Sequence, residues 1–263
     1  MLLHRLDDYQ SWRVVHRGTA LLIDPWLTPE PITGGFTRQH TDGFTTHAGM
    51  SARSESVAAV LLCTSVNDHL RPETIRLFPN TPVHGPLKAA KIARGLGCSS
   101  THANKPGDTF SYECADGGRL AVTVTACGLP LAAIAHGYLI EGIEPDGSTA
   151  ARMWIEPHQP TVKVASQLGP IDAAVLPCQS VTAVVLPVTA GPKQSAASAI
   201  ACSARAVVPT ATNPRRDMAP WQKALYYVRG GVDRLQSRLS QRAQVVELRP
   251  HEMLDLGQAT RSV

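Results

Sequence analysis

Short apolar runs recur along the chain and predict most of its β-strands. Some alternate with polar residues, as Val122 and Val124 do with Thr123 and Thr125, which is typical of a strand with one buried face. Others are continuously apolar, which is typical of a strand covered on both faces. We predict strands at residues 12–16, 20–24, 58–63, 120–126, 137–141, 152–156, 172–177, 205–210 and 244–248.

Helical patterns fall between these strands. Pro72 and Glu73 favour a helix start. In the last helical segment apolar residues recur every three or four positions, which indicates one buried stripe. Gly230 and Gly231 interrupt that stripe, so one helix and two helices meeting at a break both fit. We predict helices at residues 71–78, 85–97, 191–202 and 219–241.

The order of these elements predicts an α/β protein in which sheets pack on each other with helices outside. We find no linker and no internal repeat, and therefore expect a single domain over residues 1–263. Residues 28–56 fit neither period and are rich in Thr, Gly and His, which predicts a long loop. A loop of that length in a compact domain is usually a lid or a binding loop.

The net charge of +4 is unevenly distributed. The predicted helical segment 214–243 holds seven Lys or Arg against two Asp and carries +5, whereas the rest of the chain carries −1. This segment is a candidate surface for an acidic protein partner, a membrane surface or RNA, or simply a solvated helix face. It lacks the interleaved aromatic residues of single-strand binding, so we do not expect nucleic acid as a partner.

The cysteines and the hydropathy pattern bear on the compartment. The six cysteines form no CxxC pair and several lie in apolar runs, which favours buried, reduced thiols over a disulfide framework. No apolar run approaches the roughly 20 residues that a membrane span needs. We expect a soluble intracellular protein, either cytoplasmic or in an organelle such as a plastid. The first strand is expected almost at Met1, which leaves room for an upstream targeting peptide that has been removed.

The stretch VLLCTSVNDHLRPETI, residues 60–75, holds the main candidate chemistry. An apolar run ends in a small polar loop with Asp68 and His69, and a helix start follows. Many metal-dependent hydrolases place several histidines and an aspartate in such a loop, whereas this loop has one of each. Asp68 could instead fix the turn through backbone N–H groups, and His69 could be a packed, hydrogen-bonded side chain.

The order of the sequence pieces resembles the metallo-β-lactamase superfamily. Within it, the chain is most similar to stand-alone hydrolase-like proteins that include the ascorbate-lactonase-like group. The resemblance implies a four-layer αββα sandwich with the site at one edge, between the two sheets. The pieces that carry it are LLIDPWL (21–27), DHLRPET (68–74), PVHGPLKAAKIARGLG (82–97), LAVTVTACGLPL (120–131), HGYLIE (136–141), MWIEPH (153–158), GPIDAAVLP (169–177) and ARAVVPT (204–210).

The metal site that this resemblance implies is incomplete in the sequence. The superfamily holds two zinc ions through an HxHxDH loop and later ligands. The loop positions fall on Thr64, Val66, Asp68 and His69, so both leading histidines are missing. The last histidine of the family would fall near Ala211. The resemblance therefore implies a degenerate member, similar to a histidine-poor branch of plants and cyanobacteria, with Asp68 and His69 as remnant ligands only.

Other residues could support or replace that site. Asp24 resembles the family's aspartate after the second strand, which orients the site loop through hydrogen bonds. His158 is the best third group for a rearranged single-metal site or acid–base dyad with Asp68 and His69, and Glu156 is a second candidate.

A thiolate site is a further alternative, since three cysteines end strands that should point towards the site edge. These cysteines are Cys63, Cys127 and Cys178. Buried free cysteines are also common as plain apolar residues.

Three functional hypotheses remain open. The first is a non-catalytic binding or scaffolding relative of the hydrolases, for which no cofactor is expected. The second is a metal-dependent hydrolase of an ester, lactone or phosphoester, with zinc in a rearranged site. The third is an interaction protein that works through the basic segment and that should expose an apolar patch beside it. Convergence of Asp68, His69 and His158 around one point would favour the second.

Overall fold

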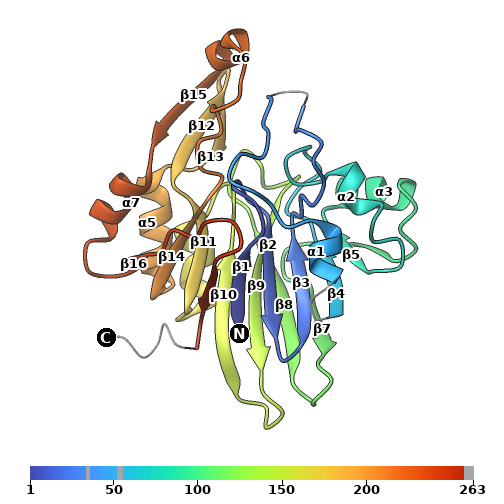
Figure 1. Ribbon diagram of the computed structural model, residues 1–263. Coiled ribbons are helices and arrows are strands. Elements are labelled where there is room, and N and C mark those ends of the chain that lie inside the picture. The colour runs from blue at the N-terminus through green and yellow to red at the C-terminus, as the bar shows by residue number, and fades with distance from the viewer. Residues whose placement is uncertain (34–35, 52–55, 258–263) are drawn as a thin grey trace.

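Two seven-stranded sheets and one three-stranded sheet organise the part of the chain that the structure describes, residues 1–33, 36–51 and 56–257 of a computed structural model (Figure 1). Sheet one has the order β17-β1-β2-β3-β4-β5-β6, sheet two β16-β14-β11-β10-β9-β8-β7, and the small sheet β13-β12-β15. The strands are β1 (Leu2–Arg5), β2 (Trp12–His16), β3 (Thr19–Ile23), β4 (Ser56–Leu61), β5 (Val83–Gly85), β6 (Thr101–Ala103), β7 (Thr109–Glu113), β8 (Arg119–Ala126), β9 (His136–Ile143), β10 (Thr149–Ile155), β11 (Ala173–Pro177), β12 (Gln179–Ala183), β13 (Leu186–Thr189), β14 (Ala206–Thr210), β15 (Tyr226–Gly230), β16 (Gln244–Val245) and β17 (Met253–Asp255). The helices are α1 (His47–Ser51), α2 (Pro72–Ile75), α3 (Leu87–Gly95), α4 (Val162–Leu168), α5 (Pro192–Ala201), α6 (Pro220–Leu225) and α7 (Val232–Leu239).

The alternation of side chains along each strand builds the layers. In β3, Leu21 and Ile23 face the core between the two large sheets, whereas Leu22 faces the helices outside. In β11, Val175 faces the same inner core and Leu176 faces the opposite helical layer. Both strands are therefore buried on two faces, which explains their continuously apolar sequences.

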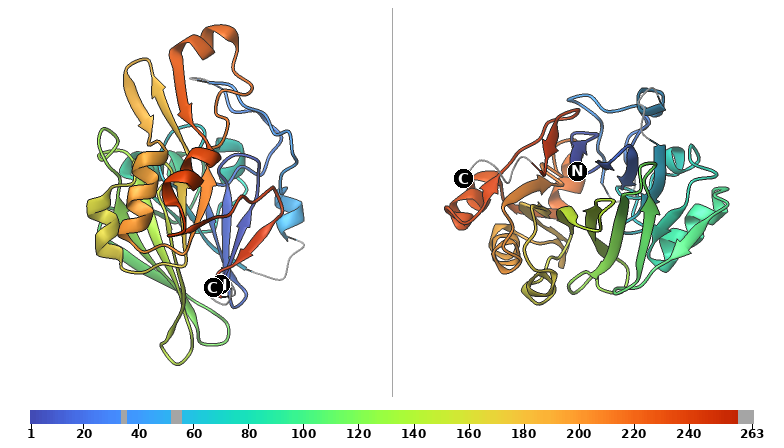
Figure 2. Two further views of the ribbon diagram at one scale, coloured as in Figure 1. Left: turned by 90° about the vertical axis from the view of Figure 1, so that its left-hand side faces the viewer. Right: turned by 90° about the horizontal axis from the view of Figure 1, so that it is seen from below.

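Helices cover the outer face of each large sheet, as the view from below in Figure 2 shows. Apolar residues of α2 and α3 pack on sheet one, and those of α4, α5 and α7 pack on sheet two. The order helix, sheet, sheet, helix confirms the predicted αββα sandwich.

The prediction of a helical segment over 219–241 is wrong in its middle. Residues 226–230 form β15, which pairs antiparallel with β12, and only α6 and α7 on either side are helical. Tyr226, Tyr227 and Val228 favour an extended strand, and pairing with β12 satisfies their backbone groups. The predicted single buried stripe is wrong as well, since Trp221 and Leu225 are exposed while Leu235 and Leu239 are buried.

Most other elements lie where the apolar runs predicted them. The sequence analysis missed α4 and several short strands, whose patterns are too brief to carry a period. The long loop predicted at 28–56 contains the short helix α1 and an isolated bridge between Ile32 and Arg38. Residues 34–35 and 52–55 of that loop lie outside the described residues.

Candidate functional site

The ends of β3, β4, β8 and β10 meet at one edge of the sandwich, between the two large sheets. Each of these strands is followed by a loop that carries a polar or sulfur-containing side chain close to the strand end. Above them lies a cavity of about 490 Å³, lined by both large sheets and by the small sheet. Asp68, His69 and His158 all line this cavity, so the structure brings the three predicted site residues to one place.

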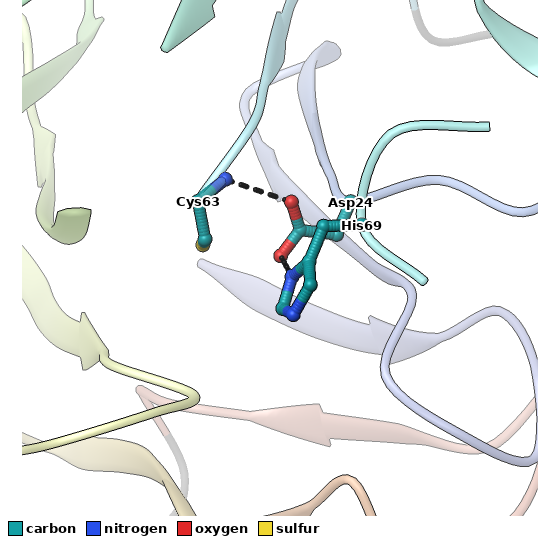
Figure 3. A group of neighbouring side chains, drawn as sticks. All are labelled: Asp24, Cys63 and His69. Atoms are coloured by element: carbon teal, nitrogen blue, oxygen red, sulfur yellow. Dashed lines mark hydrogen bonds and ion pairs between the residues drawn. The ribbon is translucent and has the colours of Figure 1, made fainter. Parts of the chain in front are cut away.

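Asp24 holds His69 in place at the floor of the cavity (Figure 3). The Nδ1 atom of His69 lies 2.7 Å from Oδ2 of Asp24, and the backbone N–H of Cys63 donates to Oδ1 of the same carboxylate over 2.8 Å. Asp24 follows β3 directly and adopts a left-handed backbone conformation with φ of 46°. Asp is one of the residue types that tolerates this conformation. All three side chains are buried.

The charges around His69 decide its protonation. Burial by itself would lower the pKa of the imidazole, but Asp24, with Asp68 and Glu156, outweighs burial and raises the pKa to about 9. The ring is therefore an imidazolium at neutral pH when no metal is bound. Its Nε2 atom lies 3.7 Å from Oδ2 of Asp68, which is a distance for charge attraction rather than a hydrogen bond.

His158, Glu156 and Cys127 form a second buried group beside the first. One ligand atom from each lies within 4.8 Å of the others, and the same holds for Asp24, Cys63 and His69. The rings of His69 and His158, with centroids 4.5 Å apart, connect the two groups. Asp68 belongs to neither group of three.

The two groups differ in which of their atoms are free to bind a metal. In the first, both oxygens of Asp24 already accept hydrogen bonds. In the second, Oε1 of Glu156 accepts the backbone N–H groups of His158 and Gln159, but Oε2 has no partner. The Nδ1 atom of His158 forms no hydrogen bond and lies 3.8 Å from Oε1 of Glu156, and both residues are almost completely buried. Buried polar atoms without partners are costly, so a ligand that occupies them would be stabilising.

The second group fits a single metal ion by its chemistry. Cysteine sulfur, histidine nitrogen and carboxylate oxygen are all zinc ligands, and three protein ligands leave a fourth position open, as in catalytic zinc sites. Burial and the neighbouring Glu156 raise the pKa of the Cys127 thiol, so a metal would have to displace its proton on binding. The described residues thus include groups suited to a metal, which does not support the expectation of no cofactor.

The positions that the resemblance assigned to the dinuclear site do not fit two metals. The hydroxyl of Thr64 donates to the backbone carbonyl of Ile134, and the side chain of Val66 is about half exposed at the cavity mouth. Ala211 lines the same cavity and carries no ligand atom. No step of chemistry can be assigned to two metals bound at these positions.

The six cysteines lie in different parts of the fold. All six are free and buried, as the sequence predicted. Cys63 and Cys127 lie in the two groups at the cavity floor, whereas Cys178 packs against the outer helices of sheet two. Glu156 and His158 were both predicted as candidates in one loop, but Cys127 was not joined to them, because only the meeting of the β8 and β10 loops does so. The backbone N–H of Gly128 donates to the carbonyl of Gln159 between these loops.

Comparison with known proteins identifies the fold. No protein-family model matches the sequence, and no curated protein sequence matches it significantly. Among solved structures, an isothiocyanate hydrolase from Delia radicum gut bacteria superposes with a TM-score of 0.67 at 14% identity, covering 97% of this chain and 99% of that one. A metallo hydrolase from the archaeon Ignicoccus hospitalis gives 0.65 at 15% identity, covering 96% and 97%. The metallo-β-lactamase fold protein YhfI from Bacillus subtilis gives 0.61 at 11% identity, covering 96% and 98%.

The chain therefore has the metallo-β-lactamase fold, and metal-dependent hydrolases are among the proteins whose structures resemble it. Within the described residues, no helix is both long enough and apolar enough to cross a membrane.

Proposed function

We propose that this protein is a metal-dependent hydrolase of small, uncharged esters or lactones, with one metal held by Cys127, Glu156 and His158. The observation that carries the proposal is a pair of buried atoms without hydrogen bonds, Nδ1 of His158 and Oε2 of Glu156, beside Cys127 and next to the cavity. The convergence of His69 and His158 on the cavity floor supports a reacting site over a purely structural cluster.

The lining of the cavity argues for an uncharged substrate. Its walls are mostly apolar, with Ile32, Phe36 and Leu131 among them. Besides its histidines, its charged lining groups are Asp68 and Lys88, which have opposite signs. A phosphoester would bring negative charge into this apolar space near Asp68, which is unfavourable. Esters and lactones therefore fit better than phosphoesters.

The residues of the floor have separable roles in this proposal. A bound metal would supply an acidified water molecule as the nucleophile. His158, Glu156 and Cys127 would hold the metal. His69, fixed by Asp24 and facing the cavity, would move the proton that the reaction requires. Asp68 would orient His69 from the cavity side.

Metal content and turnover measured together test this proposal. The chelator-treated protein is reloaded with zinc, washed and analysed for zinc per chain, and then assayed on short-chain nitrophenyl esters, lactones and phosphoesters. We expect one zinc per chain and turnover of esters or lactones. His158→Ala should lose both the metal and turnover, whereas His69→Ala should lose turnover and keep the metal.

A binding role without turnover is the second candidate, because Thr64, Val66 and Ala211 cannot ligate the metals of the fold's usual site. This alternative would replace the hydrolase if two results are found together. The protein stays free of zinc after zinc loading, and it binds a small apolar ligand in the cavity. Stoichiometric zinc without turnover of any ester or lactone would leave the metal site standing and refute the proposed reaction.

A further inference from the structure

The small sheet and α6 form an arm that extends beyond the two large sheets, with α6 at its far end (Figures 1 and 2). We call β12, β13, α6 and β15, with the turn at 184–185, the arm. The backbone N–H of Val184 donates to the carbonyl of Leu225 over 2.7 Å and joins the β12–β13 turn to the end of α6. The two parts of the tip therefore present a common surface.

The tip of the arm exposes large apolar side chains in contrast to the packed body. Val184 is 70% exposed, Val185 is 86% exposed and Trp221 is 63% exposed. Burial of such groups is strongly favourable, and several of them exposed at a protruding end indicate an interaction site. The other exposed apolar residues of the arm are Leu186, Leu225 and Tyr227.

The charges of the arm are all positive. Residues 178–189 carry no charged side chain, and residues 218–230 carry only Lys223 and Arg229. Neither residue has an ion-pair partner among the described residues. Lys223 also lines a hollow of about 390 Å³ together with Arg215 and Arg216. Only Arg216 of this set forms ion pairs, with Asp8 and Asp217.

The arm also forms one wall of the cavity described above. Val181, Ala183, Val188 and Tyr226 line it from this side. Leu186 belongs to the cavity wall and is also 47% exposed, so the apolar surface continues from the tip towards the cavity.

We propose that the arm docks this protein onto an anionic lipid bilayer. Val184, Val185 and Trp221 enter the boundary between headgroups and acyl chains, and Lys223 contacts lipid phosphates. Arg229, which lies opposite Ser180 nearer the body, adds to the positive charge of the arm. Apolar and aromatic residues flanked by cations are the pattern of interfacial membrane binding. Pairing with a second copy of the arm is disfavoured, because it would bring the cations of both copies together with no carboxylate on either arm to offset them. The inference does not depend on hydrolysis, and it would place the cavity beside the membrane surface.

Vesicle binding followed by tryptophan fluorescence tests the docking surface. Trp12, Trp26 and Trp154 are buried, so a change of emission on binding reports Trp221. With vesicles of phosphatidylcholine containing about 30% phosphatidylserine, we expect co-sedimentation and a blue shift that weaken as salt is added. Pure phosphatidylcholine vesicles should bind much less.

Variants with matched controls test whether the tip of the arm is the surface that binds vesicles. Val185→Asp and Lys223→Glu should each weaken vesicle binding roughly tenfold or more. The matched controls are Leu87→Asp on α3, which is 59% exposed, and Arg234→Glu on the exposed side of α7. Both controls should bind like the unchanged protein.

Three results would overturn the inference. The first is an absence of co-sedimentation with the anionic vesicles. The second is an equal loss in Lys223→Glu and Arg234→Glu, which would make general positive charge responsible. The third is concentration-dependent dimer formation that Val185→Asp abolishes, without vesicle binding, which would assign the tip to a second copy of the chain. Zinc content and turnover are measured separately, so failure here leaves the proposed hydrolase untouched.

Discussion

Two buried carboxylates at the cavity floor differ in what their oxygens contact. This difference separates a carboxylate that positions protein groups from one that can bind a metal. Both oxygens of Asp24 accept hydrogen bonds from the protein, whereas Glu156 keeps one oxygen without a partner. The two histidines differ in the same way, since Nδ1 of His158 forms no hydrogen bond while that of His69 bonds Asp24. At the scale of residues, the atoms open to a metal belong to Glu156 and His158.

Removal of one of these ligands should remove the metal. His158→Ala is expected to lower zinc affinity by about 100-fold or more, because loss of a direct ligand exceeds the 10–100-fold effect typical of outer groups. Competition with a zinc-binding dye measures the affinity. His102→Ala changes an exposed histidine outside the cluster and should leave the affinity unchanged. Equal affinities in the two variants would contradict the assignment.

Asp24→Asn should show that the orientation of His69 and the binding of the metal are separate functions. The amide keeps the size of the carboxylate but removes the charge that holds His69, so turnover is expected to fall roughly 100-fold while zinc content stays unchanged. Asp146→Asn, in an exposed turn, is the matched control. Loss of zinc in Asp24→Asn would instead make Asp24 a ligand.

At the scale of elements, a close contact between two loops assembles the proposed metal site. A Cβ atom placed on Gly128 would lie 2.7 Å from Cγ2 of Thr161 and 2.8 Å from the carbonyl oxygen of Gln159. The absence of a side chain at this position lets the loop after β8 approach the loop after β10. That approach sets Cys127 beside Glu156 and His158.

Gly128→Ala should therefore push the loops apart. We expect a loss of about 1–3 kcal/mol in the free energy of unfolding, the usual cost of overpacking, together with weaker zinc binding. Urea unfolding and dye competition measure the two effects. Gly95→Ala is the control, since a Cβ there meets nothing within 4 Å and α3 should gain rather than lose stability. Unchanged zinc affinity in Gly128→Ala would show that the site does not need this contact.

At the scale of the whole molecule, buried titratable groups couple stability to pH, and His84 is the clearest case. Burial lowers the pKa of His84 to about 4, and the ring contacts Asn104 and the hydroxyl of Tyr112. The unfolded chain, with an ordinary histidine pKa near 6.5, binds more protons than the folded one between about pH 6.5 and 4. The contribution of His84 to stability therefore falls as the pH falls through this range. His69, whose pKa is raised, contributes in the opposite direction.

The difference between the unchanged protein and His84→Gln isolates this effect. Between pH 7.5 and 5.5 the unchanged protein should lose roughly 1 kcal/mol more unfolding free energy than the variant, since the contribution of His69 is common to both. Urea unfolding at the two pH values measures it. Parallel changes in both proteins would mean that His84 is not held neutral by the fold.

The sequence by itself determined nine strands of the two large sheets, most helices and the layered architecture. Runs such as residues 58–62 and 173–176 have to be covered on both faces, and this requirement fixes an α/β sandwich with helices outside. The sequence also placed Asp24, His69 and His158 in loops at strand ends, because a polar residue that interrupts an apolar run marks the end of a strand. These inferences succeed because they rest on local periodicity.

Only the tertiary structure decided the composition of the site and the nature of the arm. Cys127 lies far in the sequence from Glu156 and His158, and nothing local to it predicts that it meets their loop. Residues 226–230 carry a spacing that fits a helix, yet they form a strand because β12 offers hydrogen-bond partners from a distant part of the chain. Pairing and packing between distant segments obey no local period, so the cavity and its metal ligands emerge only when the two sheets are brought together.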